Sequence, residues 1–442
     1  MKLPATLLAF ALLGACSSSK DQRKDSAAAA QNDTVIEAYT ASPDLPPPYA
    51  TKSTVNTCEV LGWGENSTPQ APAGFRVGKF AGDLQNPRWI YVLPNGDVLI
   101  AETKKETSLA EKAVKKISGR SKAEGDSKPV NRISLFRDTN KDGTPDQRTV
   151  FLQELNMPFG MLLLNGWFYV ADSDALWRFP YKEGQTEITA PGEKLLDIPE
   201  SGRHWTRNIV ANKAGTKIYI AVGSGSDVAE DGIEKEHRRA CILEVNPDGT
   251  GERLYGSGLR NPVGMDWAPG TATLWTAVNE RDELGDDLVP DYLTSVKDGG
   301  FYGWPYSYFG QHLDPRVKEQ RPDLVKKAIV PEVQLGAHTA SLGLDFYEGK
   351  SFPEKYRGGA FIGQHGSWNR SVLSGYKVVF VPFSNGQPSG PMEDFLTGFI
   401  VPGSNKQVYG RPVGVTALPD GSLLVADDAG KTVWRVVYEG KK

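Results

Sequence analysis

A strand–turn–strand pattern recurs six times along this chain. The copies begin at Pro87, Pro158, Asn208, Pro262, Ser341 and Pro412. In each copy a short strand leads into a turn with Gly or Asn, and a second strand ends in small or acidic residues, as in NPRWIYVLPNGDVLIAET. Internal repetition on this scale indicates a solenoid, propeller or array, and short strands with Gly and Pro turns favour four-stranded blades. The sequence therefore predicts an all-β fold, a six-bladed β-propeller. A stack of two β-sandwiches is the alternative, and it explains the matched copies less well.

Length and composition agree with a propeller. A chain of 442 residues is long for one ordinary domain, but a propeller arranges all of it around one axis. The 47 glycines and 30 prolines suit the several tight turns that every blade needs. The formal net charge of −4 gives no indication of nucleic-acid binding.

The N-terminus indicates export. Lys2 precedes the apolar run LPATLLAFALLGA, which is too short to span a bilayer and has the layout of a secretion signal. The sequence Leu13-Gly14-Ala15-Cys16 resembles a bacterial lipobox, in which Cys16 becomes the lipidated first residue. Cleavage of an ordinary signal peptide nearby is the alternative. We expect a cell-envelope lipoprotein, anchored by its N-terminal lipid in the outer membrane and facing the periplasm.

These features divide the chain into three parts. Residues 1–15 are the expected signal peptide, residues 16–55 a lipidated cysteine with a disordered tether rich in Ser, Ala and Pro, and residues 56–442 the propeller. In an oxidising compartment Cys58 and Cys241 are able to form a disulfide, but sequence alone leaves open whether they pair.

The loop DTNKDGTPD has the spacing of a calcium-binding loop. Asp138, Asn140, Asp142 and Asp146 occupy positions one, three, five and nine of that pattern. The bidentate Glu of position twelve is replaced by Thr149. The loop is therefore a candidate for a structural calcium site, and an acidic Asp-Gly turn is the alternative.

Polar residues gather where the predicted blade strands begin or end. The apolar strand LWTAV leads into the highly charged loop from Asn279 to Asp287. His204 and His338 come just before blade strands, and His365 follows one. Because loops that enter the innermost strands lie at one face of a propeller, we expect these three clusters to converge around the axis.

The ordered motifs resemble a known family. They are GRHWTRNIV, VGSGSDV, GLRNPVGMDW, NERDELGDDLVPDY, GWPY and GRPVGV. Together they resemble the soluble quinoprotein sugar dehydrogenases, in particular the sorbosone dehydrogenase-like branch with the aldose and pyranose dehydrogenases, over about residues 72–440. The resemblance implies a six-bladed propeller that binds pyrroloquinoline quinone (PQQ) and Ca²⁺ at its axis. It also implies oxidation of a small-molecule sugar, with electrons passed to an acceptor such as a quinone or a cytochrome.

The resemblance assigns roles residue by residue. It makes His204 the base that removes the hydroxyl proton, and it places Arg260 and Asn261 against the quinone. Further candidate cofactor contacts are Arg281, Thr339, Trp368, Asn369 and Arg411. The candidate ligands or neighbours of the cofactor calcium are Asp282 and Glu283, through their backbone carbonyls, and Asp286 and Asp287, through added charge.

The sequence departs from the family at the partner of the base. Some members carry an orienting Asp at the end of the next strand, where this chain has Val222-Gly223-Ser224. The nearest acid is Asp227, a candidate for the missing orienter or for a substitute base.

Two other functions stay open at this stage. One is a propeller lactonase or hydrolase, which needs an axial metal-binding set that Glu102, Asn208, Asn279 and Asp427 have the residue types to form. The other is a non-catalytic binding propeller at the cell surface.

Overall fold

The apolar runs of the sequence form short strands that pair antiparallel into six main sheets. The computed structural model describes residues 44–108, 120–125, 127–200 and 202–440. In chain order, the first sheet consists of β3 (Pro87–Val92), β4 (Val98–Glu102), β5 (Arg132–Arg137) and β6 (Gln147–Leu152). The second consists of β7 (Gly160–Leu164), β8 (Trp167–Ala171), β9 (Ala175–Pro180) and β10 (Glu193–Asp197). The third consists of β11 (Ile209–Ala211), β12 (Ile218–Val222), β13 (Cys241–Val245) and β14 (Arg253–Ser257), and the parallel β18 (Gly300–Phe301) extends it.

The other three sheets complete the set. The fourth consists of β15 (Pro262–Trp267), β16 (Leu274–Val278), β17 (Pro290–Ser295) and β21 (Val333–Ala337). The fifth consists of β22 (Ser341–Phe346), β23 (Ala360–Gln364), β24 (Lys377–Val381) and β27 (Glu393–Leu396). The sixth consists of β29 (Pro412–Ala417), β30 (Leu423–Asp427), β31 (Thr432–Tyr438) and β2 (Phe75–Ala81).

Three short strand pairs and four helical turns lie outside the six main sheets of the described chain. The pairs are β1 (Glu59–Val60) with β28 (Gln407–Val408), β19 (Ser307–Tyr308) with β20 (His312–Leu313), and β25 (Phe383–Ser384) with β26 (Gln387–Pro388). The described helical turns are α2 (Arg120–Ala123), α3 (Pro322–Val325), η1 (Ile233–Glu236) and η2 (Glu354–Tyr356). No helix within the described residues is long and apolar enough to cross a membrane.

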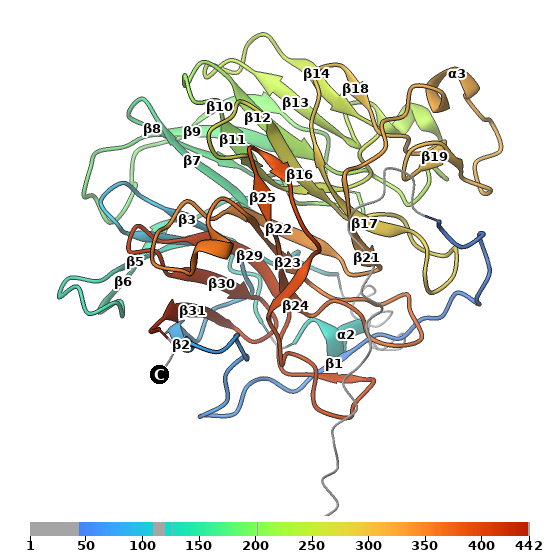
Figure 1. The fold of residues 1–442 in the computed structure, drawn as a ribbon. Helices are drawn as coiled ribbons and strands as arrows, with labels where there is room; N and C mark the ends of the chain where they lie inside the picture. Colours follow the sequence, from blue (N-terminus) through green and yellow to red (C-terminus); the bar gives the residue numbers. More distant parts are fainter. Residues whose placement is uncertain (1–43, 109–119, 126, 201, 441–442) are drawn as a thin grey trace, which may run out of the picture. The chain divides into compact units, whose positions relative to one another are not determined.

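The six sheets close into a ring. Their first strands contact one another in the order β3, β7, β11, β15, β22 and β29, and β29 contacts β3 in turn. The last sheet is completed by β2 from the N-terminal side, which pairs with β31 near the C-terminus (Figure 1). Each predicted copy begins within two residues of one of these inner strands. The predicted six-bladed β-propeller is confirmed.

The hydrophobic core lies between the blades. Six clusters of buried side chains join the blades, and the largest joins the fifth and sixth through residues such as Phe361 and Trp434. Both side chains are at most 1% exposed. Because burial of apolar area stabilises by about 25 cal/mol per Å², the interfaces between the blades hold the ring together. One cluster also joins Val263, Leu342 and Val413 from the inner strands of blades four, five and six.

Glycine in the inner strands allows the blades to approach at the axis. A Cβ at Gly343 would lie 2.1 Å from the carbonyl oxygen of Val413, and one at Gly264 would lie 2.6 Å from the amide nitrogen of Leu344. The adjacent blade thus excludes a side chain at both positions. This close approach explains the recurring Gly in the motifs PVGM and SLGL.

Two carboxyl groups link blades four, five and six near the axis. Asp266 on β15 accepts a hydrogen bond from the amide of Phe346 (2.7 Å), and Asp345 on β22 accepts one from the amide of Ala417 (3.0 Å). Burial raises the pKa of Asp266 to about 6, and burial followed by the charge of Asp266 raises the pKa of Asp345 well above its ordinary value. Ionisation of this pair therefore opposes folding.

Replacing Asp345 with asparagine is expected to stabilise the protein at pH 8 and not at pH 4. A carboxyl whose pKa is raised on folding makes stability fall as pH rises from its unfolded pKa through its folded one, and asparagine removes this loss. Asparagine also keeps an acceptor for the Ala417 amide. Thermal unfolding should show a gain in Tm on the order of 2 °C at pH 8. An equal gain at pH 4 would contradict the electrostatic explanation.

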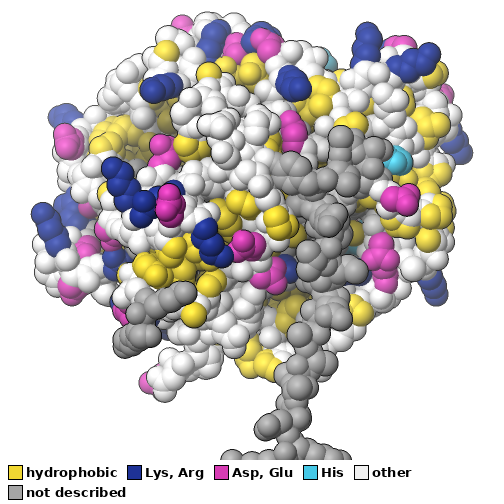
Figure 2. Space-filling view, in the orientation of Figure 1, with side chains coloured by type: hydrophobic (Ala, Val, Ile, Leu, Met, Phe, Trp, Pro, Cys, Tyr) yellow, Lys and Arg dark blue, Asp and Glu magenta, His cyan; other side chains and the backbone are white. Residues whose placement is uncertain are grey.

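The two described cysteines do not form a disulfide. Cys58 and Cys241 are both buried free thiols, so the question that the sequence left open is answered by their positions in separate parts of the fold. Cys16 and the predicted signal peptide lie outside the described residues. Basic and acidic side chains are intermixed on the face shown in Figure 2, as the small net charge leads one to expect.

Candidate functional site

The predicted site residues come together at one end of the ring. They precede the inner strands, as His204 and Arg260 do, or follow the second strands, as Asn279 does. Because these strands are antiparallel neighbours, the start of one and the end of the next lie side by side. The six-fold repeat therefore places loops distant in sequence around one axial position.

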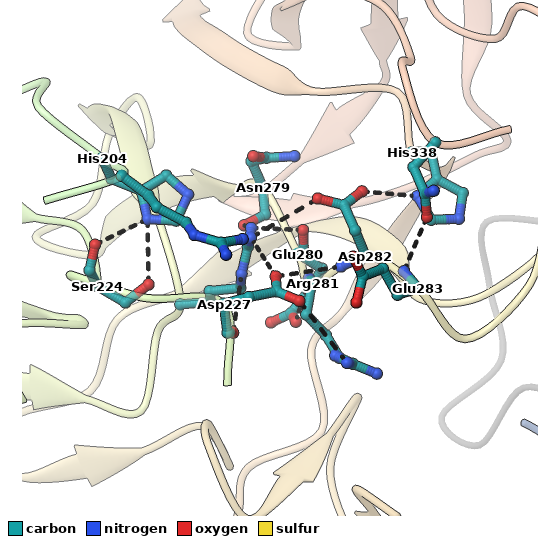
Figure 3. Close-up of polar contacts among 12 residues, drawn as sticks. His204, Ser224, Asp227, Asn279, Glu280, Arg281, Asp282, Glu283 and His338 are labelled. Atoms are coloured by element: carbon teal, nitrogen blue, oxygen red, sulfur yellow. Dashed lines mark hydrogen bonds and ion pairs between the residues drawn. The ribbon is translucent and has the colours of Figure 1, made fainter. Parts of the chain in front are cut away.

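His204 is held in one tautomer. Its Nδ1 lies 2.9 Å from the carbonyl oxygen of Ser224 and 3.0 Å from the Ser224 hydroxyl oxygen (Figure 3). That hydroxyl donates its own hydrogen to the carbonyl of Ser226 (2.6 Å), so both partners of Nδ1 are acceptors. Nδ1 therefore carries the hydrogen and donates it. Nε2 keeps its lone pair and has no hydrogen-bond partner among the described residues.

The surroundings keep this imidazole neutral. Burial and then the positive charge of Arg260 lower the pKa of His204 well below its ordinary value of 6.5. The loop itself is rigid, because Arg207 is fully buried and donates hydrogen bonds to the carbonyls of His204 and Pro199. His204 is thus a fixed, neutral base with an unprotonated Nε2.

Asp227 lies at the centre of a buried ion cluster. It accepts a hydrogen bond from Nη2 of Arg260 (2.6 Å), and Arg316 and Arg281 approach its other oxygen at 3.3 and 3.8 Å. Burial acts to raise the pKa of Asp227, but the charges of Arg260 and Arg281 outweigh it and lower the pKa. Asp227 makes no hydrogen bond to His204. In this geometry it is the counter-ion that positions Arg260.

Arg260 joins three loops at the axis. Its Nη1 donates to the backbone carbonyls of Asn279 (3.2 Å) and Glu280 (2.6 Å), while its Nε and Nη2 face Asp227. Its backbone carbonyl accepts from the amide of Ser224, the residue that orients His204. The neighbouring Asn261 is 4% exposed, and its Oδ1 has no hydrogen-bond partner among the described residues.

The side chain of Arg281 lies among buried acids rather than at the axial face. Its guanidinium is almost fully buried and lies 3.2 Å from the carboxylate of Asp314. Figure 3 shows this side chain directed away from His204 and His338. The structure therefore places Arg281 in the ion cluster around Asp227, and no described contact turns it toward the axial face.

The loop predicted to hold calcium presents backbone rather than carboxylates. The side chain of Asp282 faces His338 (3.0 Å), and that of Glu283 faces Arg316 (2.7 Å). Neither backbone carbonyl of these two residues accepts a hydrogen bond from the described part of the chain. Glu283 has a φ of 71°, a left-handed conformation that turns the backbone at this point.

The side chains of Asp286 and Asp287 are directed toward the loop after β23. The Asp286 carboxylate accepts hydrogen bonds from the amide and hydroxyl of Ser371, and Asp287 forms an ion pair with Arg370 (3.1 Å). Both pairs join the loop after β16 to the loop after β23. Among the described residues, no three His, Cys, Asp or Glu side chains are grouped to hold a metal ion.

His338 braces the same loop as a cation. Its Nδ1 faces the Asp282 carboxylate, and its Nε2 faces the carbonyl of Gly285 (2.8 Å), so both ring nitrogens meet acceptors. Burial lowers the pKa of His338, but the hydrogen bond and charge of Asp282 outweigh it and the pKa is raised. His204 and His338 thus lie on either side of the Arg260–Asp282 contact with opposite proton states (Figure 3).

The end of the predicted tether lies on this loop. The amide of Tyr49 donates to the carbonyl of Leu284 (2.7 Å), and the Thr51 hydroxyl accepts from the amide of Asp286 (2.7 Å). Asn369 accepts from the amide of Glu283 (2.8 Å) and from the hydroxyl of Ser53 (3.2 Å). The segment around residues 49–56 therefore holds the loops of blades four and five together.

The other predicted cofactor contacts divide into two groups. Thr339 donates to the buried Asp291 (2.9 Å), and the carbonyl of Trp368 accepts from the amide of Asn56, so both belong to the framework beside the loop from Asn279 to Asp287. Arg411 lies in a second polar cluster, where its Nε and Nη2 donate to the carbonyls of His365 and Gly366 (both 3.0 Å).

This second cluster contains residues that sequence reasoning missed. Nε2 of His365 donates to Asp428 (2.9 Å), and Asp428 also pairs with Arg88 (2.5 Å). Asp428 directly follows β30, the same position that Asn279 has after β16, and that repeat position was the available signal. His365 and His204 thus belong to separate clusters at the same end of the ring.

The candidate calcium loop at residues 138–146 is closed by its own hydrogen bonds. Asp138 accepts from the amides of Asp142 (3.2 Å) and Gly143 (2.6 Å), and Asp146 accepts from the Thr139 hydroxyl (2.7 Å). Asn140 donates to Asp142 (3.1 Å). These contacts are those of an Asp-Gly turn, and the side chains do not form a metal-binding group in the described structure.

Comparison with known proteins agrees with the motifs. The profile of the Glucose / Sorbosone dehydrogenase family matches residues 171–369, and a TrAA12-like profile matches residues 313–439. An uncharacterized protein of Borreliella burgdorferi is 32% identical over 248 residues, which cover 55% of this chain and 63% of that protein. The PQQ-dependent pyranose dehydrogenase of Coprinopsis cinerea is 22% identical over 421 residues, 82% of this chain and 53% of the enzyme. The chain therefore spans about half to two thirds of these relatives.

Solved structures share the fold. The holo PQQ domain of the Coprinopsis cinerea pyranose dehydrogenase superposes with a TM-score of 0.68 at 20% identity, covering 86% of this chain and all of that domain. The PQQ-bound aldose sugar dehydrogenase of Streptomyces coelicolor gives a TM-score of 0.54 at 16% identity, covering 83% of this chain and 99% of the other. The resemblance to the quinoprotein sugar dehydrogenases that the motifs predicted is confirmed.

Proposed function

We propose that this protein is a PQQ-dependent sugar dehydrogenase in which His204 removes the hydroxyl proton of the substrate. The observation that carries the proposal is the fixed tautomer of His204, whose unprotonated Nε2 lies at the axial end of the propeller. The matching family profile and the shared fold support the same class of reaction. The substrate class is an aldose, a sorbosone-like sugar or another pyranose.

His204 suits this task by its proton state. Oxidation of an alcohol or hemiacetal removes a proton from oxygen and a hydride from carbon. The neutral imidazole accepts the proton at Nε2, and its Nδ1–H donates to the Ser224 carbonyl throughout, so the ring does not need to rotate. The carbonyl dipole also stabilises the imidazolium that forms. The Ser224 carbonyl thereby takes the part of the orienting Asp that this chain lacks.

The axial residues fit the cofactors that the family resemblance implies. Bound PQQ supplies a two-electron acceptor, and bound Ca²⁺ supplies a Lewis acid. Asn261, with its buried and unpartnered Oδ1, and Arg260 beside it would contact the quinone. Arg411, whose Nη1 is not used in its two described hydrogen bonds, would meet a cofactor carboxylate. The free carbonyls of Asp282 and Glu283 are hard oxygen donors of the kind that Ca²⁺ prefers.

The lactonase alternative has less support. Glu102 is fully buried and engaged by Arg132 and Ser134, and Asp427 is fully buried and accepts from the indole of Trp63 (2.6 Å). Both carboxylates are thus committed to the framework at the strand ends. Neither carboxylate is therefore left unengaged for the metal-binding set of Glu102, Asn208, Asn279 and Asp427 that a lactonase would need.

Incubation with Ca²⁺ and PQQ should load the purified protein. The expected result is a quinone absorption band that stays with the protein through gel filtration, and sugar-dependent reduction of a dye. A chelator should abolish both, because the carbonyl-lined loop holds the metal only weakly without carboxylates. Failure to retain the quinone in the presence of Ca²⁺ would contradict the proposal, and retention that is insensitive to chelator would contradict the calcium-assisted form of it.

We further propose that Cys16 is lipidated and anchors the protein to the envelope membrane, where a quinone or a cytochrome accepts its electrons. Replacing Cys16 with serine is expected to release the protein into the soluble fraction, because the acyl chains supply the membrane affinity. Cell fractionation with immunoblotting measures this. A serine variant that stays with the membranes as the parent does would refute the lipid anchor.

A further inference from the structure

A polar groove, separate from the candidate site, lies between the first two blades. It has a volume of about 480 Å³ and is bordered by the end of β6, by β9 and by the segment before β10. Four of its lining residues are acids, namely Glu154, Asp172, Asp174 and Glu187. The other lining residues include no Lys, Arg or His. The described residues give these acids no ion pair. The groove is therefore strongly negative.

One of these carboxylates is buried without a full set of partners. Asp172 is 3% exposed, and its Oδ2 accepts a hydrogen bond from the amide of Asn156 (3.0 Å). Its Oδ1 has no hydrogen-bond partner in the described structure, although Asp172 lines the groove. A buried acceptor left unpaired is costly, so this atom indicates a ligand that donates a hydrogen bond.

Aromatic side chains of the same blade as Asp172 also line the groove. Trp177 is half-buried and lines the groove beside Phe179. A Cβ at Gly192 would lie 2.4 Å from the Phe179 ring, so the backbone of this segment lies directly against that ring. Aromatic side chains and carboxylates in one groove are the combination that recognises an organic cation, because the ring quadrupole and the acids both attract positive charge.

A metal ion fits the groove poorly. No three of the described acidic side chains converge as a metal-binding group, and a divalent ion gains nothing from the aromatic side chains. Asp174 is already partly compensated by the charges of Arg207 and Lys194. The acids without a described ion pair or nearby cation are Glu154, Asp172 and Glu187, which line a groove large enough for one sugar ring or a short alkyl chain.

We propose that this groove binds a protonated primary amine carried on a compact skeleton such as an amino sugar. The ammonium group donates to Asp172 Oδ1, and the skeleton lies against Trp177. Asp172 directly follows β8, as Gly223 directly follows β12 near His204, so the groove opens on the same end of the propeller as the candidate active site. The site does not depend on the proposed dehydrogenase activity.

Calorimetry with matched probes tests the proposal. In the presence of saturating glucose, which occupies the proposed axial sugar site, glucosamine is still expected to bind the full-length protein, whereas the uncharged N-acetylglucosamine should bind about tenfold more weakly or less. Putrescine, an alkyl amine without a sugar ring, distinguishes a site for amino sugars from a site for amines in general. Binding by glucosamine alone identifies an amino-sugar site, and binding by both amines identifies a general amine site. Equal binding of N-acetylglucosamine, or no binding by either amine under these conditions, would overturn the proposal.

Proton release gives a second measure. Burial, followed by the charge of Asp174, raises the pKa of Asp172 to about 7. The described groups that act on it are the Asn156 amide, which donates to it, and the negatively charged Asp174, while Glu154 and Glu187 line the same groove, so the bound ammonium is the new positive charge. Binding near pH 7 should therefore release a fraction of a proton, which calorimetry in two buffers of different ionisation enthalpy detects. Proton uptake would contradict the assignment.

Variants locate the binding. Asp172→Asn and Trp177→Leu are each expected to weaken amine binding about tenfold or more, and Glu187→Gln severalfold. Glu187 is exposed, so its variant tests the groove even if a core variant fails to fold. Glu183→Gln is the control, because this exposed acid lies near β9 but outside the groove. Unchanged binding in the folded Glu187 and Trp177 variants would place the amine elsewhere.

Discussion

Replacing His204 with glutamine is expected to lower the rate of sugar-dependent dye reduction about 100-fold or more, the usual scale of general-base catalysis. Glutamine is similar in reach and can keep a hydrogen bond to the Ser224 carbonyl, so the fold and the affinity for PQQ should change little. Steady-state kinetics of the Ca²⁺- and PQQ-loaded protein measures the rate, and quinone titration measures the affinity.

The same substitution at His237 is the control, because His237 is exposed and lies outside the site. The parent should also keep its activity below pH 6.5 and lose it only as pH falls further. This follows because a base with a lowered pKa stays unprotonated to lower pH. A His204→Gln protein that turns over at the parental rate would show that another residue accepts the proton.

The fold was accessible from the sequence because the pattern that specifies it is local and repeated. Each hairpin has its own turn signals, and six copies leave little choice of architecture. The predicted openings at Pro87, Pro262, Ser341 and Pro412 coincide with the first residues of inner strands. The close approach of Gly264 and Gly343 to the next blade then explains why the motifs repeat at those positions.

The site was predictable only to the level of which loops meet. Ring closure brings the residues beside the inner strands together, so His204, Arg260 and the loop after β16 were placed correctly around the axis. The direction of each side chain is set by partners distant in sequence. Asp286 and Asp287 face Ser371 and Arg370, and Arg281 faces Asp314.

The orienter of His204 had no signature in the sequence. It is a backbone carbonyl, at Ser224, and any residue type supplies one. The sequence drew attention instead to Asp227, the nearest acid. Its partner Arg316 comes from the loop after β20, which contains no recognisable motif, so the ion cluster was not predictable.

Replacing Asp227 with asparagine is expected to destabilise the protein by about 3–5 kcal/mol, because it removes the nearest counter-ion of the buried Arg260 and weakens the charge balance around Arg281. Arg260 and Arg281 are 2% and 1% exposed, so neither can recover its solvation in water. Chemical denaturation at pH 7 measures the loss. The loss should persist as pH falls to 3.8, the ordinary pKa of this carboxyl, and narrow only below it, because a lowered folded pKa adds stability above the unfolded value.

Asp298→Asn is the matched control, since Asp298 also pairs with an arginine, Arg253, but is 60% exposed. An exposed ion pair contributes about 0–1 kcal/mol, so this variant should unfold almost as the parent does. Loss of Asp227 should also weaken quinone binding, because Arg260 would no longer be held beside Asn261. If Asp227→Asn is as stable as Asp298→Asn and binds the quinone normally, Asp227 is not the counter-ion that positions Arg260. A normal stability with a large loss of turnover would instead return Asp227 to the role of base.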